Sequence, residues 1–307
     1  MNGMTKRLRT ALVVAKHAEP LREGSVRPRT FELDFEDVPH LAAFRRMVRS
    51  QDFAICELPV TTYLSARVYG KPFTAIPVFP WRAFHHGAIV HNTRSGVKTP
   101  KDLEGRKVGV NRGYTVTASV WARGILQHQY GVRLDTITWV RSGDEHVVEY
   151  RPPSNVVPIE KGKTLEELVT SGEVAAATGV KIDSPHVKPL IPNAEEAAVD
   201  ALRRTGYYPI NHTVVVRNDV LEANPGLAAD LYDTFVAAKH HYLERLKSGQ
   251  IENPDPVHVR AMEIIGDPLP YGIEPHRQML ETLIGYAVEQ GIVPQRVAVE
   301  DLFAIRR

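Results

Sequence analysis

Short apolar runs that alternate with helical patterns constrain the fold of this chain more than any other feature. Each run is too short for an ordinary helix, and the segments between most of them repeat their apolar residues every three or four positions. This alternation is typical of an α/β protein. The predicted strands cover residues 10–14, 53–57, 73–78, 88–91, 107–110, 136–140, 174–177 and 213–217.

Start and stop signals place helices between and after these strands. Asn224-Pro225 begins the longest predicted helix, whose apolar residues recur up to Gly249. Pro275 begins another, which Gly291 ends. Thr164 and Glu167 have the spacing of a capping box. Other predicted helices cover residues 41–49, 62–69 and 116–126, and segments 141–163 and 248–270 are interpreted as connections.

Length and charge narrow the class of protein. A chain of 307 residues is too long for one compact core and suits two domains. Its 38 Lys and Arg against 36 Asp and Glu give a formal net charge of +2. Proteins that bind nucleic acid usually carry a basic excess, so we expect no nucleic-acid partner.

The cysteine and histidine content argues against a metal or cofactor site. Cys56 is the only cysteine, which excludes an intramolecular disulfide and a metal site made of thiolates alone. The histidines form no His-Glu-x-x-His pattern, and no dinucleotide fingerprint appears. We therefore expect neither a metal nor a cofactor.

The N-terminal segment predicts a cytoplasmic protein. Lys6, Arg7 and Arg9 resemble the basic start of a signal peptide, but the apolar run 11–15 ends at Lys16. A secretory signal needs about 7–15 apolar residues. No window approaches the roughly 20 apolar residues of a membrane-spanning helix, so we also expect no membrane span.

Several stretches together resemble one family. The most specific are 76–86 (IPVFPWRAFHH) and 270–275 (PYGIEP), and the stretch 102–110 (DLEGRKVGV) is general to a fold. With 56–64, 120–126 and 212–217, they occur in the family's order over residues 8–303. On these residues the chain resembles the 4,5-dihydroxyphthalate decarboxylase family. It departs from the family in segments 16–20, 110–117 and 178–181.

The resemblance implies a fold and a reaction. The fold would be the two-lobed α/β fold of type II periplasmic binding proteins, with a ligand cleft between the lobes. Lobe 1 would comprise residues 1–95 plus 215–307, and lobe 2 residues 96–214. The enzyme would be a decarboxylase of a hydroxylated aromatic carboxylic acid, similar to the conversion of 4,5-dihydroxyphthalate to 3,4-dihydroxybenzoate and CO2. Its small-molecule partner would be an aromatic carboxylate. Apart from the resemblance, a homo-oligomer is left open by the sequence.

Two other functions remain open at this point. One is a non-catalytic solute-binding protein of the kind that serves ABC transporters, and the other is a different lyase on the same fold. The short apolar run near the N-terminus and the histidines that match the family favour the enzyme. The departing segments favour another ligand or reaction.

Decarboxylation of an electron-rich aromatic acid requires an acid, a group that manages the phenol proton, and cations for the carboxylates. Histidine suits the acid role, because its pKa lies near neutrality. Arginine suits carboxylates, because its fork binds both oxygens. His86 and His212 match histidines of the family, and Arg82 lies four residues before His86 in the sequence.

We predict that His86 is the proton donor. On a strand, period 2 would put His85 and His86 on opposite faces, so only one would point into the cleft. We expect His212 to hold a carboxylate or the phenol, and Arg82 to bind a carboxylate. A structural histidine is the alternative for His86.

The remaining candidates lie at predicted element ends. Glu57 ends a strand, where ligands bind in open α/β sheets, and it would orient a histidine or accept a phenolic proton. Its alternative role is to cap the following helix. Thr61 and Thr62, like Tyr114 and Thr115 in the second lobe, would offer groups at a helix start to an anion. Arg204 is a further predicted ligand, with a solvated helix end as its alternative role.

Overall fold

The computed structural model describes residues 6–13 and 15–307, which form two compact units. Unit 1 comprises Met1–Arg82, Ile210–Glu281 and Val297–Arg307, and unit 2 comprises Ala83–Pro209 and Thr282–Arg296. The chain therefore leaves unit 1 after Arg82 and returns at Ile210. The lobe limits that the resemblance implied lie at 95/96 and 214/215, and that lobe assignment stays a prediction.

Unit 1 is built on a five-stranded mixed sheet with the order β2-β1-β3-β11-β4. Strand β1 pairs in parallel with β2 and β3, whereas β11 runs antiparallel to both β3 and β4. The late strand β11 therefore lies inside the sheet, between two strands from the start of the chain. The strands are β1 (Lys6–Ala11), β2 (Phe31–Phe35), β3 (Ile55–Pro59), β4 (Phe73–Ile76) and β11 (His212–Arg217).

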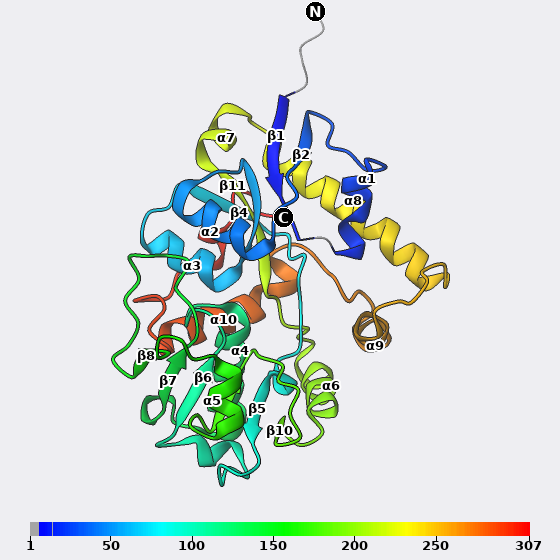
Figure 1. The fold of residues 1–307 in the computed structure, drawn as a ribbon. Helices are drawn as coiled ribbons and strands as arrows, with labels where there is room; N and C mark the ends of the chain where they lie inside the picture. Colours follow the sequence, from blue (N-terminus) through cyan, green and yellow to red (C-terminus); the bar gives the residue numbers. More distant parts are fainter. Residues whose placement is uncertain (1–5, 14) are drawn as a thin grey trace, which may run out of the picture. The chain divides into compact units, whose positions relative to one another are not determined.

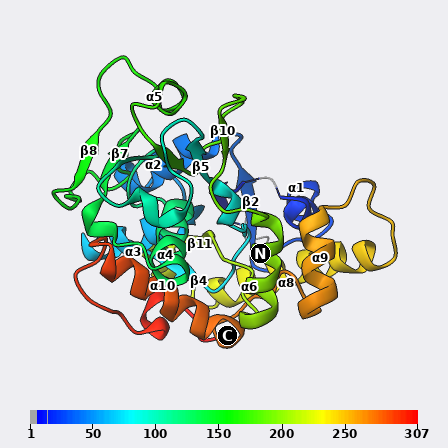
Figure 2. The same cartoon turned by 90° about the horizontal axis from the view of Figure 1, so that it is seen from below.

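Helix α8 provides much of the core of unit 1. Its Leu231 and Phe235 pack against strand residues such as Ile55 and Val214, and all four are buried. Figures 1 and 2 show α8 (yellow) beside the short α1, which it contacts. The helices of this unit are η1 (Lys16–Ala18), α1 (Glu19–Glu23), α2 (His40–Ser50), α3 (Val60–Val68), α7 (Asn218–Ala223), α8 (Leu227–Lys247), α9 (Pro256–Ile265), η5 (Glu274–His276) and η6 (Val299–Leu302).

Unit 2 has a six-stranded mixed sheet with the order β10-β5-β9-β6-β7-β8. Strands β9, β6, β7 and β8 pair in parallel, and β5 pairs antiparallel with β9 and β10. The strands are β5 (Ile89–Asn92), β6 (Lys107–Val110), β7 (Thr138–Arg141), β8 (Val156–Pro158), β9 (Ala176–Thr178) and β10 (Val187–Pro189).

Caps define several helices of unit 2. Thr164 Oγ1 accepts from the Glu167 N–H, and the Glu167 carboxylate accepts from the Thr164 N–H, which confirms the predicted capping box. Helix α10 (Arg277–Glu289) begins in unit 1 and ends in unit 2, where Tyr286 lies edge-on to Trp121. The other helices are η2 (His86–Ala88), η3 (Pro100–Leu103), α4 (Thr117–Tyr130), η4 (Leu134–Thr136), α5 (Leu165–Ser171) and α6 (Ala194–Thr205).

The structure confirms the predicted α/β class and corrects several elements. The predicted strand at 10–14 overlaps β1 only at its end, and its last residue, Val14, lies outside the described residues. The interpretation of 248–270 as a connection was wrong, because this segment contains the helix α9. Asp255 caps that helix by accepting from the Val257 N–H. The short strands β2, β8 and β10 were missed. Of the described residues, none forms a helix long and apolar enough to cross a membrane.

A tight contact in unit 2 yields a stability prediction. A Cβ placed on Gly124 of α4 would lie 2.2 Å from ring carbons of Tyr286. We expect Gly124→Ala to lower the free energy of unfolding by about 1–3 kcal/mol, because the packed ring must shift. Gly87→Ala is the control, because its Cβ would meet only Ala194, at 3.7 Å. Equal stability of the two variants in urea unfolding would contradict this packing.

Candidate active site

A buried carboxylate–histidine pair lies on two neighbouring strands of unit 1. In the antiparallel register Glu57 of β3 faces Val214, so His212 is two residues away on the same face of β11. His212 Nδ1 donates to Glu57 Oε1 at 2.6 Å. The Val13 N–H donates to the other oxygen, Oε2, at 3.0 Å. The side chain of Glu57 is 1% exposed and that of His212 15%, so both carboxylate oxygens are held away from water.

Aromatic rings fix the orientation of the His212 imidazole. Trp81 stacks on it with ring centroids 6.1 Å apart, and Phe44 meets it edge-on at 5.2 Å. Trp81 is 43% exposed, which is unusual for an indole. Because Glu57 engages Nδ1, the Nε2 atom is the one placed to exchange a proton with a ligand.

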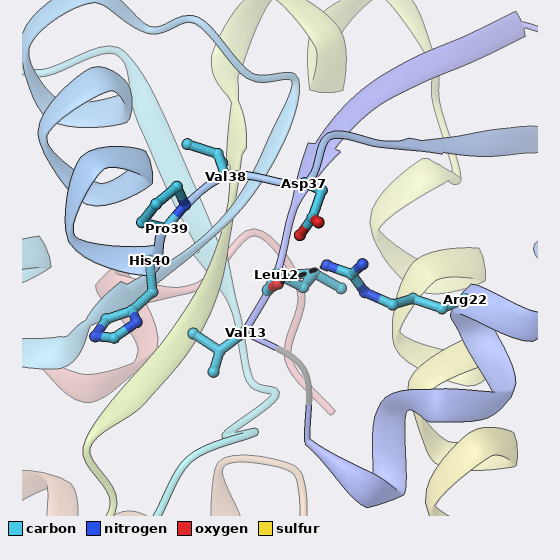
Figure 3. A pocket seen from close by; sticks show the side chains of 7 residues that line it. All are labelled: Leu12, Val13, Arg22, Asp37, Val38, Pro39 and His40. Atoms are coloured by element: carbon cyan, nitrogen blue, oxygen red, sulfur yellow. Dashed lines mark hydrogen bonds between the residues drawn. The ribbon is translucent and has the colours of Figure 1, made fainter.

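Unit 1 also holds a pocket of about 350 Å³ (Figure 3). It is lined by the segments that follow β1 and β2 and by Arg22 of α1. The Arg22 guanidinium donates to the Leu12 carbonyl at 3.3 Å, and the Asp37 carboxylate points toward Leu12. Val13 connects the pocket to Glu57 through its N–H. The lining residues are Leu12, Val13, Arg22, Asp37, Val38, Pro39 and His40.

Arg82 is the last residue of the first segment of unit 1, and hydrogen bonds hold its guanidinium. Its Nη2 donates to the Pro270 carbonyl at 2.7 Å and to His276 Nε2 at 2.6 Å. His276 Nδ1 in turn donates to the Gly272 carbonyl at 2.9 Å, which leaves Nε2 as the acceptor. Burial, followed by the charge of Arg82, lowers the pKa of His276 to about 3. The imidazole is therefore neutral at pH 7.

The charge of Arg82 also affects the pKa values of two further buried groups, His17 and Tyr271. Burial, then the charges of His258, Arg82 and Lys239, lowers the pKa of His17 to about 3. Lys239 Nζ pairs with Asp267 at 2.7 Å and lies 5.2 Å from the ring centroid of Tyr271. Unit 1 thus collects two cations, two neutral histidines and a phenol within its interior.

His86 belongs to unit 2 and Arg82 to unit 1. The argument from strand period was wrong, because His86 begins the 3-10 helix η2, and both His85 and His86 are buried. The Nε2 of His86 is 2.9 Å from Gln129 Oε1 of α4. Burial is the main cause that lowers the pKa of His86, which favours its neutral form at pH 7. Its Nδ1 is buried with no hydrogen-bond partner among the described residues, and the role of His86 stays a prediction.

The predicted anion site at the start of α4 already holds a carboxylate of the protein itself. The backbone N–H groups of Tyr114 and Thr115 donate to Glu145 at 2.6 and 3.2 Å, and Thr115 Oγ1 donates to it at 2.7 Å. Arg123 Nη2 donates to the Tyr114 carbonyl, with its guanidinium 3.7 Å from the centre of that ring. An internal anion therefore engages the groups that we assigned to substrate.

The other predicted substrate-binding residues, Thr61, Thr62 and Arg204, lie on the helices α3 and α6. Thr61 and Thr62 are fully buried in the first turn of α3. Arg204 is exposed in the last turn of α6, where its Nε donates to the Asp200 carbonyl at 3.4 Å. Cys56 is buried, and burial raises the pKa of its thiol. In the described part of the chain, no three His, Cys, Asp or Glu side chains are grouped to hold a metal ion.

Sequence reasoning missed His17, Lys239, Tyr271 and His276. Tyr271 lies within the stretch 270–275, which indicated the family but suggested no chemistry. His17 lies in segment 16–20, one of the departures from the family pattern. Lys239 sits in a helix whose sequence gives no sign that its ammonium is buried.

Two curated proteins match the chain, whereas no family model does. A 4,5-dihydroxyphthalate decarboxylase of Comamonas testosteroni is 35% identical over 66% of each chain. A 4,5-dihydroxyphthalate decarboxylase of Pseudomonas putida is 34% identical over 53% of this chain and 69% of its own. The chain belongs to the 4,5-dihydroxyphthalate decarboxylase family. The alignments therefore span about two thirds of each decarboxylase relative, just under that share for the Comamonas protein.

Solved structures confirm the predicted periplasmic-binding-protein fold for this decarboxylase family member. The sulphonate-binding protein SsuA of Escherichia coli superposes with a TM-score of 0.55 at 13% identity, covering 97% of both chains. SsuA of Xanthomonas axonopodis bound to MOPS gives 0.57 at 13% identity, covering 99% of this chain and 100% of its own. The desulfurization enzyme DSZB gives 0.54 at 14% identity over 97% and 96%. At such low identities these matches establish the fold alone.

The buried histidines predict an acid-sensitive stability. An unfolded histidine takes up its proton near pH 6.5, whereas His17 and His276 do so in the folded chain near pH 3. The unfolded state therefore binds more protons between these values, and the free energy of unfolding falls as the pH falls. The slope is up to about 1.4 kcal/mol per pH unit for each histidine.

His276→Gln tests this slope, because the amide can still donate to Gly272 and accept from Arg82. We expect its unfolding free energy, measured in urea at pH 7, 6 and 5, to fall less steeply than that of wild type by about 1 kcal/mol per pH unit. His240→Gln, at an exposed position of α8, should keep the wild-type slope. An unchanged slope in His276→Gln would contradict a neutral buried His276.

Proposed function

We propose that the chain is a decarboxylase of a hydroxylated aromatic carboxylic acid, of the 4,5-dihydroxyphthalate type, and that His212 is its proton donor. The observation that carries the proposal is the Glu57–His212 pair, held at 2.6 Å in a member of this family. A histidine whose Nδ1 is fixed by a buried carboxylate has its Nε2 available for proton transfer.

The proposed step transfers one proton and breaks one carbon–carbon bond. The proton moves from Nε2 of the His212 imidazolium to the ring carbon that bears the departing carboxylate. The bond to that carboxylate then breaks, its electron pair returns to the ring, and CO2 leaves. The product carries hydrogen in place of the carboxylate, and His212 takes its next proton from water.

Glu57 has the supporting role in this step. Its negative charge, 2.6 Å from Nδ1, stabilises the imidazolium before the transfer and fixes the ring tautomer afterwards. The Val13 N–H and the buried setting hold the carboxylate in one orientation. The exposed face of Trp81 beside His212 offers a flat apolar surface for an aromatic ring.

This ranking places His212 before His86, our first choice from the sequence. Burial lowers the pKa of His86, whose Nε2 contacts the Gln129 amide, whereas His212 has a carboxylate partner. Roles for Arg82, Thr61, Thr62 and Arg204 in binding carboxylates stay predictions. The cleft between lobes, a cytoplasmic location and a homo-oligomer also stay predictions.

The test measures single-turnover CO2 release from 4,5-dihydroxyphthalate. We expect His212→Gln to lower the rate constant by about 10²–10⁴-fold with little change in affinity, because proton transfer acts in the transition state. Glu57→Gln should lower the rate as well. His86→Gln is the matched variant and should retain a rate near wild type.

Other outcomes select the alternatives. A large loss in His86→Gln with an active His212→Gln would return the acid role to His86. Binding of the acid without CO2 release by wild type would support a solute-binding protein or a different lyase.

A further inference from the structure

The pocket of unit 1 lies at the edge of the sheet where ligands bind in α/β proteins. It is lined by the segments that follow β1 and β2, two parallel strands whose carboxyl ends share that edge. Ligands of open α/β sheets bind outside the carboxyl ends of the strands. The volume of about 350 Å³ is within the range of about 300–1,000 Å³ that is usual for small-molecule sites.

Asp37 brings to this pocket a carboxylate that forms no hydrogen bond or ion pair with any described residue. The preceding Glu36, by contrast, is held by Arg9 and Arg46, each at 2.5 Å. Figure 3 shows the Asp37 carboxylate directed toward Leu12. An unpaired carboxylate only accepts hydrogen bonds, and it repels other anions, so it suits a hydroxyl group of a ligand.

Arg22 lines the same pocket and has donors available for a ligand. Among the described residues, its guanidinium forms one hydrogen bond, to the Leu12 carbonyl at 3.3 Å, and lies 5.3 Å from the ring centroid of Phe35. A guanidinium carries five N–H donors, so most of them remain free for other partners. The pocket therefore presents an acceptor and a donor, which match a ligand edge that has both.

The register of the sheet places this pocket close to the buried carboxylate of the candidate active site. Phe35 of β2, Thr10 of β1 and Ile55 of β3 form one row across the three parallel strands. Asp37 and Glu57 each follow that row by two residues, on the two sides of β1. Two strand spacings therefore separate their backbones, a distance of about 10 Å.

Two lining residues also reach the Glu57–His212 pair through printed contacts. The Val13 N–H donates to Glu57 at 3.0 Å. The His40 ring lies 5.7 Å from the ring of Phe44, which in turn lies 5.2 Å from the ring of His212. The pocket and the pair therefore lie in one region of unit 1.

We propose that the pocket binds the hydroxylated edge of the substrate ring. One hydroxyl donates its hydrogen to Asp37, and the oxygen of the adjacent hydroxyl accepts from Arg22. Because Asp37 repels carboxylates, the opposite edge of the ring, which carries them, meets His212. The inference rests on the proposed function and adds to it the residues that select hydroxylated over plain aromatic acids.

The negative charge of Asp37 also suits the reaction. Protonation of the ring carbon that bears the departing carboxylate makes the ring positive, and the hydroxyl para to that carbon shares this charge. The Asp37 carboxylate, which accepts from that hydroxyl, stabilises the developing charge. The adjacent hydroxyl is meta to the same carbon and does not share the charge, so it suits the cationic Arg22.

The test compares the affinities of phthalate and 4,5-dihydroxyphthalate by calorimetry. We expect wild type to bind the hydroxylated acid more tightly. Asp37→Asn should weaken binding of that acid by about 10-fold, because a charged acceptor is lost, and should not weaken binding of phthalate. Binding of 3,4-dihydroxybenzoate, which keeps both hydroxyls, should weaken by the same factor. The thermal midpoint should stay that of wild type, because Asp37 has no partner among the described residues.

Asp34→Asn is the matched control, because Asp34 of β2 pairs with Arg7 and does not line the pocket. It should keep the wild-type affinities. Arg22→Gln should weaken the hydroxylated acids as Asp37→Asn does. Absence of a hydroxyl preference in wild type, or its persistence in both Asp37→Asn and Arg22→Gln, would overturn the subsite. If the preference behaves as expected and wild type releases no CO2, the subsite stands and the decarboxylase function fails.

Discussion

The hydrogen bonds to the Glu57 carboxylate bring together three segments that are distant in the sequence. One oxygen accepts from the segment after β1 through Val13, and the other accepts from His212 at the start of β11. A buried carboxylate is costly unless it is paired and hydrogen-bonded, so both contacts are needed to keep Glu57 inside the sheet. Val13 also lines the pocket, and Trp81 stacks on His212, so both features are in contact with residues that bind Glu57.

The sequence predicted the fold class well, because that class depends on patterns that repeat along the whole chain. The strand at Lys107–Val110 is found as predicted, and the capping box at Thr164 forms with both reciprocal hydrogen bonds. The missed strands β2, β8 and β10 are all edge strands, and β10 has only one buried residue. A strand with so little buried surface leaves almost no apolar signal, so its pairing is specified by neighbours that the sequence does not reveal.

The sequence predicted the candidate site only in part, because the contacts within it depend on the tertiary structure. Glu57 and His212 were both named as candidates, but their contact depends on the register of β3 against β11, which no local pattern encodes. Tyr114 and Thr115 were assigned to a ligand because a helix start attracts anions, and that physical argument was sound. The anion is Glu145, some thirty residues along the chain, and its identity requires the tertiary structure.

The position of β11 within its sheet limits when the sheet of unit 1 can form during synthesis on the ribosome. Its neighbours β3 and β4 are made first, but they pair through a strand that starts only at His212. By then nearly all of unit 2 has been synthesised, whereas unit 1 still lacks an inner strand. Pairings of such large sequence separation form slowly. Residues 83–209 of unit 2 are thus synthesised before Glu57 can pair with His212, and unit 1 remains without its inner strand until then.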